Sequence, residues 1–220
     1  MAGSKRLPKK WLWLVLWLAA WLAGQSTPLV AQSEVDLPPG FVLEVVANKL
    51  DGPTAFAQAP DGRFYITQKS GAVRVVQDGQ LLRENFVDLS AEVNQAFNRG
   101  LVGVALHPDF PRTPYVYLSY VYQPPEARSH KESGARLSRV IRLSADPNNL
   151  NRALENSGQV ILGGNSTFPL IGNPDKSDSP PFSCRDAAGG PVRDCVPVEG
   201  TAHQIDMLRF GRDGALYVGV

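Results

Sequence analysis

The sequence predicts an all-β fold built from a repeated strand–turn–strand unit. The clearest copy contains the apolar segment 101–106, the turn His107-Pro108-Asp109 and the aromatic segment 115–120. The same pattern surrounds the turns Pro60-Asp61-Gly62 and Arg212-Asp213-Gly214. Apart from the first 31 residues, no segment shows a long helical period. Three copies of a unit of this length indicate a repeat architecture, and we therefore expect the blades of a β-propeller.

The expected strands follow one another along the chain with turns between them. After a polar lead-in at residues 32–40, the β-rich segment 41–46 is predicted to be a strand. The first blade is expected to have strands at residues 55–59, 63–68 and 73–77, closed by residues 86–89. The second is expected to have strands at residues 101–106, 115–122, 137–143 and 159–162. Asp-Gly and Ser-Gly pairs between the strands of the first blade permit tight hairpins.

Residues 163–200 are rich in Gly, Pro, Ser and Asp and are expected to form a long loop. Such a loop is uncommon in a compact domain and is often functional or mobile. The third copy begins at His203 and reaches Val220, one strand after its turn. Because a blade that stops there would leave an open sheet edge, we expect residues 32–220 to be the N-terminal part of a longer propeller, with two blades and part of a third.

Residues 1–31 are predicted to be a secretory signal peptide. Four basic residues precede an apolar core of 14 residues, Trp11–Gly24, and the expected cleavage follows Ala31. A membrane-spanning helix needs about 20 apolar residues, which makes an uncleaved anchor the weaker alternative. We therefore expect a periplasmic or secreted protein that touches a membrane only if its leader stays uncleaved.

The charge balance argues against a nucleic-acid-binding surface. The chain has 22 Lys and Arg and 21 Asp and Glu. Four of the basic residues lie in the leader, which has no acidic residue, so the remainder has 18 basic and 21 acidic residues, a net of −3. Nucleic acid requires a basic surface that this balance does not supply.

The only two cysteines, Cys184 and Cys195, lie in the long loop. In an exported chain two nearby cysteines are typical of a disulfide, and two free thiols are the alternative. Without a neighbouring His the pair does not make a zinc site. We predict a Cys184–Cys195 disulfide that contributes a little under ~3 kcal/mol to stability.

The motifs of several enzyme classes are missing, which leaves single residues near strand ends as candidates. The chain has no Gly-x-Gly-x-x-Gly after a strand, no Walker loop, no His-Glu-x-x-His and no Gly-x-Ser-x-Gly. His203 stands where the long loop enters an inner strand, and it is either a general base or a histidine bonded to the backbone. Asn98 and Arg99 precede another inner strand and either reach the channel mouth or are turn residues.

Other polar residues are expected to be structural. His107 is predicted to make a hydrogen bond at its turn, and His130, in a polar loop, is expected to be solvated. Asp61, Asp109 and Asp213 recur at the same place in each copy. Recurrence favours turn chemistry over metal binding, because an Asp side chain bonds the backbone two residues on.

These residues carry a resemblance to a known family. The segment Asn98–Phe110 resembles the Gly-Leu-Leu-Gly-x-Ala-x-His-Pro-Asp-Phe signature of the glucose/sorbosone dehydrogenase family, the soluble quinoprotein sugar dehydrogenases. The segments Leu37–Phe41 and Leu137–Pro147 are similar to the same family. His203 and the segment Phe210–Gly214 match the spacing of the family's His…Phe-Gly-Pro-Asp-Gly phrase.

The resemblance implies a six-bladed β-propeller with pyrroloquinoline quinone (PQQ) at the top of its channel. It implies that His203 is the catalytic base, which takes the proton of a sugar C1 hydroxyl while hydride passes to the quinone. Asn98 falls where characterised members have a cofactor-contacting Gln, so Asn98 and Arg99 are the candidate cofactor-binding residues. A calcium loop and the cationic cofactor ligands are implied beyond residue 220, with a sugar substrate and an electron acceptor as partners.

Three functions are compatible with these observations. The first is an exported PQQ-dependent oxidoreductase that oxidises an aldose sugar or a related aldehyde or alcohol, inactive as this piece alone. The second is a non-catalytic propeller of the same family that binds a ligand or partner. The third is a lactonase-like hydrolase with a channel metal, which would need several inward acidic or amide groups. Apart from Asn98 and Asp206 the chain offers few of these, and Ala202 stands where some family members have an Asp.

Overall fold

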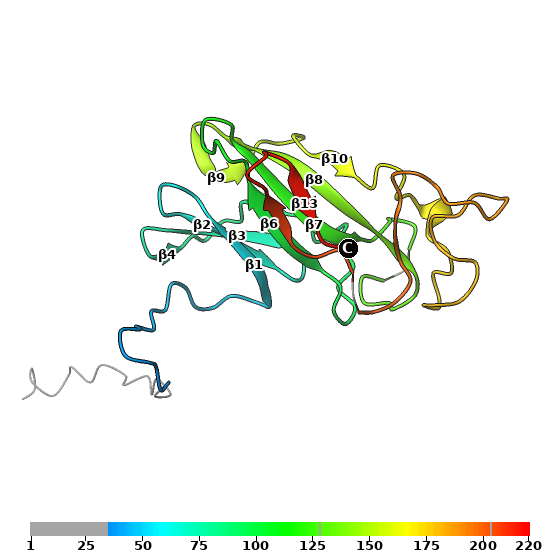
Figure 1. The fold of residues 1–220 in the computed structure, drawn as a ribbon, viewed down its shortest axis with the longest axis horizontal. Helices are drawn as coiled ribbons and strands as arrows, with labels where there is room; N and C mark the ends of the chain where they lie inside the picture. The colour runs from blue at the N-terminus through cyan, green and yellow to red at the C-terminus, as the bar shows by residue number, and fades with distance from the viewer. Residues whose placement is uncertain (1–34, 128, 203) are drawn as a thin grey trace, which may run out of the picture. The chain divides into compact units, whose positions relative to one another are not determined.

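The computed structural model of the protein describes residues 35–127, 129–202 and 204–220 (Figure 1). The predicted signal peptide, 1–31, and the candidate base His203 lie outside the described residues, so both stay predictions. The chain divides into two compact units, residues 1–44 and 45–220. In the first unit, the described residues 35–44 contain a turn and no strand.

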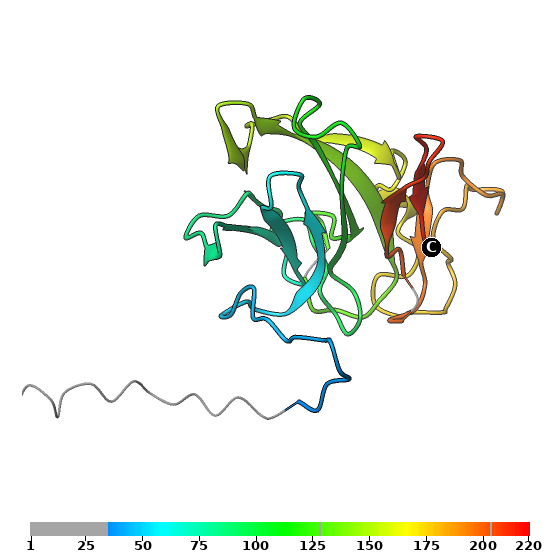
Figure 2. The ribbon, with the colours of Figure 1, turned by 60° about the vertical axis from the view of Figure 1, so that its left-hand side comes forward.

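The second unit is all-β, as predicted. Its only helix among the described residues is the single 3-10 turn η1 (Phe168–Leu170). No helix in the described part of the chain is long and apolar enough to cross a membrane. The described strands of the second unit pair antiparallel in three sheets, which lie one after another in Figures 1 and 2.

The first sheet corresponds to the first predicted blade. Its strands lie in the order β1-β2-β3-β4, and β5 also pairs with β3. Asp78 and Gly79, between β3 and β4, have φ angles of 51° and 72°. Positive φ at both positions is what a two-residue hairpin turn of the type I′ requires. The strands are β1 (Pro53–Gln58), β2 (Phe64–Gln68), β3 (Ala72–Gln77), β4 (Gln80–Leu81) and β5 (Val87–Asp88).

The second sheet corresponds to the second predicted blade. Its strands lie in the order β6-β7-β8-β10, and β9 and β11 also pair with β8. The long strand β8 therefore pairs with every later strand of this sheet, including β11 from the long loop. The strands are β6 (Leu101–Leu106), β7 (Tyr115–Tyr122), β8 (Arg136–Asp146), β9 (Asn149–Ala153), β10 (Gln159–Leu162) and β11 (Val196–Val198).

The third sheet is the hairpin of β12 (Leu208–Phe210) and β13 (Leu216–Val218). The first strands of the three sheets are neighbours, because β1 contacts β6 and β6 contacts β12. Apolar side chains fill the spaces between them. One buried cluster, which includes Tyr65, Val73 and Leu118, lies between the first two sheets. Another, around Tyr117 and Ile205, joins the second sheet to the third.

Two segments differ from the sequence-based expectation. Residues 41–46 were predicted to be a strand, but they form no strand and are exposed. Their composition is β-rich, yet no strand in the described part of the chain pairs with them, and an unpaired strand leaves its backbone groups without partners. Conversely, the long loop contains β11, whose residues Val196–Val198 pair with Arg136–Ser138 of β8. The sequence Val-Pro-Val is too short to predict a strand without that pairing.

Candidate functional site

The candidate site lies where β1 and β6, the neighbouring first strands of the first two sheets, begin. At this end, the loop that precedes β6 meets the segment that leads to β12. The backbone N–H of Asn98 donates to the carbonyl of Thr201 at 3.3 Å. The two regions that the sequence singled out on separate grounds, 98–99 and the approach to His203, are therefore neighbours.

Arg99 is fully buried at the centre of this junction. Its Nε and one terminal nitrogen donate to the carbonyl of Gly200 at 3.2 and 2.5 Å. That terminal nitrogen also donates to the carbonyl of Ser133 at 3.2 Å. The other terminal nitrogen donates to the carbonyls of Gly134 at 2.6 Å and Glu132 at 3.4 Å. A guanidinium has five N–H groups, and backbone carbonyls accept a hydrogen bond from each of them.

These contacts argue against the predicted role of Arg99 in binding a cofactor, because they leave no N–H group to offer. Burial, followed by the charge of the nearby Arg136, lowers the pKa of Arg99 to about 10. At neutral pH the guanidinium is still protonated, and the surrounding carbonyl oxygens replace the water that burial removes.

A second buried arginine, Arg136, lies behind the junction at the start of β8. Its Nε donates to Oε1 of Gln123 at 3.0 Å, and Nδ2 of Asn94 donates to the same oxygen at 2.9 Å. A terminal nitrogen of Arg136 forms an ion pair with Glu132 at 3.2 Å. Burial lowers the pKa of Arg136. Both arginines thus bind the loop before β8, Arg99 at residues 132–134 and Arg136 at Glu132. Of the two side chains, Arg99 is the one that donates to Gly200.

Asn98 and Lys69 are two polar side chains at this end of the sheets that are exposed and partly exposed, respectively. Asn98 is exposed, and among the described residues its amide makes no hydrogen bond with the protein. The ammonium group of Lys69 donates to the carbonyl of Phe97, next to Asn98. The carbonyl of Lys69 accepts the N–H of Leu101 at 3.2 Å, which fixes the turn after β2 beside the start of β6. A cation and an amide therefore lie together where the resemblance implies a cofactor.

No motif in the sequence around Lys69 marks it as a site residue. In a repeat fold each unit contacts its neighbours, and here the turn after β2 lies beside the start of β6. That relation was the available signal, and it required knowing which blades are neighbours.

The remaining histidines are structural in the described chain. Nδ1 of His107 accepts the N–H of Asp109 at 3.1 Å, and its ring packs edge-on against Phe210 at 5.8 Å. The predicted hydrogen-bonding role of His107 is confirmed. His130 was expected to be solvated, but it is half-buried and its Nδ1 lies 3.0 Å from the carbonyl of Val93. The expectation was wrong because His130 packs against residues 93–95, where the N–H of Gln95 also donates to the carbonyl of His130.

Turn chemistry accounts for two of the three recurring aspartates. Asp61 accepts the N–H of Arg63 at 3.2 Å, and Asp213 accepts the N–H of Ala215 at 3.1 Å, each two residues on. Asp109 instead forms an ion pair with Arg112 at 2.9 Å. In that copy the side chain of His107, two residues earlier, provides the turn hydrogen bond. Among the residues that the structure describes, no group of three His, Cys, Asp or Glu side chains could hold a metal ion.

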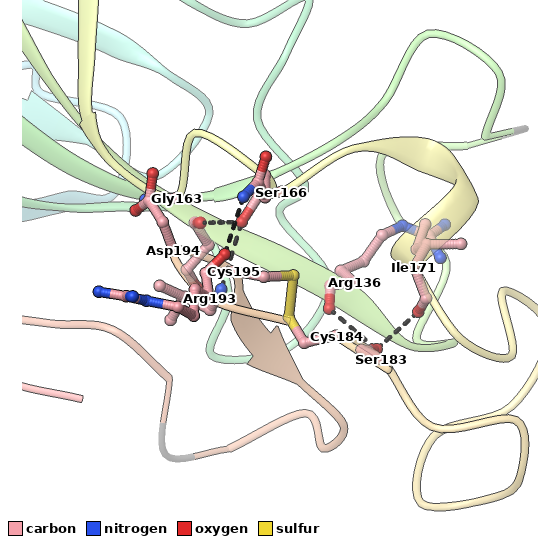
Figure 3. The surroundings of a disulfide bond; sticks show 12 residues. Arg136, Gly163, Ser166, Ile171, Ser183, Cys184, Arg193, Asp194 and Cys195 are labelled. Atoms are coloured by element: carbon pink, nitrogen blue, oxygen red, sulfur yellow. Dashed lines mark hydrogen bonds between the residues drawn. A yellow bond between two sulfur atoms is a disulfide. The ribbon is translucent and has the colours of Figure 1, made fainter. Parts of the chain in front are cut away.

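The predicted disulfide joins two points of the long loop, which β11 and Ser166 attach to β8 (Figure 3). Cys184 and Cys195 are bonded, with 5.5 Å between their Cα atoms, and the prediction is confirmed. Oγ of Ser183 donates to the carbonyl of Ile171 at 2.6 Å, and Oγ of Ser166 donates to that of Ser138 in β8 at 2.9 Å. Cys195 directly precedes β11, which leads to Gly200, so the disulfide and the candidate site share one segment.

Known proteins with similar sequences and structures agree with the all-β fold described above. The sequence model of the family "Glucose / Sorbosone dehydrogenase" matches residues 50–164, just over half of the chain. The chain belongs to this family, which confirms the resemblance carried by the segment Asn98–Phe110.

Individual relatives are similar over part of their length. An uncharacterized protein of Synechocystis is 31% identical over 128 residues, which are 54% of this chain and 29% of that protein. The quinoprotein glucose dehydrogenase B of Acinetobacter calcoaceticus is 29% identical over 123 residues, 48% of this chain and 24% of that protein. An oxidoreductase of Thermus thermophilus described as a glucose dehydrogenase matches in structure with a TM-score of 0.50 and 26% identity, over 80% of this chain and 39% of that one. The matches therefore cover less than half of each relative.

Proposed function

We propose that the protein is an exported PQQ-dependent oxidoreductase that oxidises an aldose sugar or a related aldehyde or alcohol. The observation that carries the proposal is the match of the family to residues 50–164, together with the similarity to a quinoprotein glucose dehydrogenase. The chain would form the first two blades and part of the third of a six-bladed propeller. The contacts of β6 with β1 and with β12 support this arrangement, because the inner strands of propeller blades line a common channel.

The residues at the start of β6 fit an anionic, carbonyl-rich cofactor. PQQ carries three carboxylates and supplies the hydride acceptor when bound. An ammonium group has three donors, and Lys69 gives one of them to Phe97, so it keeps others for a carboxylate. The amide of Asn98 offers both a donor and an acceptor beside it. Further cations and the calcium ligands of such a site would lie beyond residue 220.

His203 is assigned the role of general base in this proposal. A histidine titrates near neutral pH and can take the proton of a sugar hydroxyl as hydride leaves the carbon. The support comes from the spacing to Phe210 and Gly211 and from the place of Gly200 and Thr201 beside Asn98. The general acid–base function needs the imidazole held in one position, which the contacts of its preceding residues favour.

The test is the reduction of a redox dye by the full-length protein with aldoses, after addition of PQQ and calcium. Dye reduction that depends on both PQQ and the sugar would support the proposal. If the folded protein binds PQQ without turnover, or does not bind it, the non-catalytic member of the family becomes the better description. Sequencing the N-terminus of exported protein tests the leader, with cleavage expected after Ala31.

A further inference from the structure

The contacts of Arg99 join three separate segments of the chain. The loop before β8 supplies the carbonyls of Glu132, Ser133 and Gly134, and the segment before β12 supplies that of Gly200. The adjacent backbone N–H of Asn98 donates to the carbonyl of Thr201. Residues 98 and 99 therefore hold the segment that ends two residues before His203.

We propose that Arg99 is a positioning residue for the candidate base, acting through Gly200 and Thr201, and not a cofactor ligand. The expected effect on catalysis rests on the proposed function. The positioning of Gly200 and Thr201 by residues 98 and 99 does not depend on it. A carbonyl that accepts two N–H groups from one planar guanidinium is fixed in both distance and direction.

A lysine in place of Arg99 cannot reproduce this arrangement. Its ammonium group has three donors at one point, whereas the guanidinium supplies five in a fixed plane that reaches carbonyls from two loops. In Arg99→Lys, at least two of the five hydrogen bonds that carbonyls now accept are lost. The carbonyl of Gly200 accepts hydrogen bonds from two different nitrogens of Arg99. The single nitrogen of a lysine cannot replace both.

Arg136 provides a matched control. It is as fully buried as Arg99 and also donates to backbone carbonyls, those of Ala135 and Pro174 at 2.9 and 3.2 Å. Among the described residues, no hydrogen bond joins its side chain to Gly200 or Thr201. Arg136→Lys therefore disturbs a buried guanidinium beside the same loop without removing a hydrogen bond to Gly200 or Thr201.

The experiment compares the full-length parent, Arg99→Lys and Arg136→Lys by three measurements. Amide hydrogen exchange reports the order of residues 199–206, titration with PQQ reports cofactor affinity, and steady-state kinetics separates kcat from KM. Both variants are expected to have a lower Tm. Only Arg99→Lys is expected to show faster exchange over 199–206, with PQQ affinity within about threefold of the parent. Its kcat is expected to fall about 10- to 100-fold with little change in KM, since small misplacements of a catalytic group have effects of this size.

Each outcome decides one question. Unchanged exchange over 199–206 in Arg99→Lys, or equal acceleration in Arg136→Lys, would overturn the positioning role. A loss of PQQ affinity with unchanged exchange would return Arg99 to the set of cofactor ligands. If the parent shows no dehydrogenase activity, the proposed function fails, while the exchange measurement still decides whether Arg99 orders the segment.

Discussion

The guanidinium of Arg99 donates two hydrogen bonds to the carbonyl of Gly200, which lies 101 positions later in the sequence. This contact connects the start of β6 in the second sheet to the segment that leads into the third. The contact lies beside Asn98, which is exposed, and Asn98 is next to Phe97, whose carbonyl accepts from the partly exposed Lys69. Buried polar contacts with complete partners make such a junction specific as well as stable.

Removal of the disulfide is expected to destabilise the protein. Cys184 is buried against Leu137 and Ile171, and the disulfide closes a short loop that ends next to β11. The double variant Cys184→Ala, Cys195→Ala should lose about 2–3 kcal/mol of unfolding free energy in urea denaturation, since the open loop has more freedom when unfolded. Reduction of the parent with dithiothreitol serves as the control and should produce a similar loss. An unchanged denaturation midpoint in both cases would contradict the prediction.

A methyl group at Gly103 is expected to break the contact between β6 and the segment before β12. A Cβ atom there would lie 2.5 Å from the carbonyl oxygen of Asp206 and even closer to Oγ of Ser119, which donates to that oxygen at 2.6 Å. Gly103→Ala should therefore cost about 1–3 kcal/mol, as overpacking of a close contact does.

Gly158→Ala is the matched control for this overpacking. Its nearest neighbour would be a methyl group of Leu143 at 3.6 Å, an ordinary contact distance. Its effect on the unfolding free energy should be within about 1 kcal/mol, because the substitution acts mainly on the unfolded chain. Equal effects of the two substitutions would show that the contact with Asp206 has no special weight.

The ion pair of Asp146 and Arg152 is expected to make stability depend on acidic pH. The carboxylate of Asp146 accepts two N–H groups of Arg152 at 2.9 and 2.6 Å, and these bonds lower the pKa of Asp146, followed by a bond from the N–H of Asn148. Because the pKa is lower in the folded state, the contribution is complete above the unfolded pKa of about 4 and is lost as the pH falls through the folded pKa.

Thermal unfolding as a function of pH tests this dependence. The Tm of Asp146→Asn should lie below that of the parent at pH 7, and the difference should close as the pH falls below about 4. Asp109→Asn is the control, because its partner Arg112 and Asp109 itself are exposed and such pairs contribute little. A constant Tm difference across the acidic range would assign the effect of Asp146 to something other than its charge.

The sequence predicted the parts of the fold whose signal is local. The strands flanking the repeated turns appear as β1 to β3, β6 to β8, β12 and β13, and the two cysteines pair as expected. What it did not predict depends on partners far away in the chain. Residues 41–46 have strand composition without a partner, whereas β11 has a partner without strand composition. The residues next to Arg99 in the sequence are those of an ordinary turn. Its burial depends on two segments distant in the sequence, whose carbonyls accept its hydrogen bonds.

The candidate base is the subject of the last prediction. In the full-length enzyme His203→Ala should lower kcat by about 10²-fold or more, the range expected for the loss of a general base. PQQ affinity should change less, since the proposed cofactor contacts come from Lys69, Asn98 and residues beyond 220.

His107→Ala is the matched control for His203→Ala, because His107 lies at the end of β6 that is remote from Asn98. His107 follows β6 and Asn98 precedes it, and a six-residue strand separates them by about 20 Å. Loss of the His107 side chain removes the hydrogen bond from Asp109 and the packing on Phe210, which should lower Tm and leave kcat of the folded enzyme within about twofold. Dye reduction with aldoses in the presence of PQQ and calcium measures both variants. Full activity of His203→Ala would remove His203 from the mechanism, and a loss of kcat in His107→Ala equal to that in His203→Ala would show that the assay reports stability rather than catalysis.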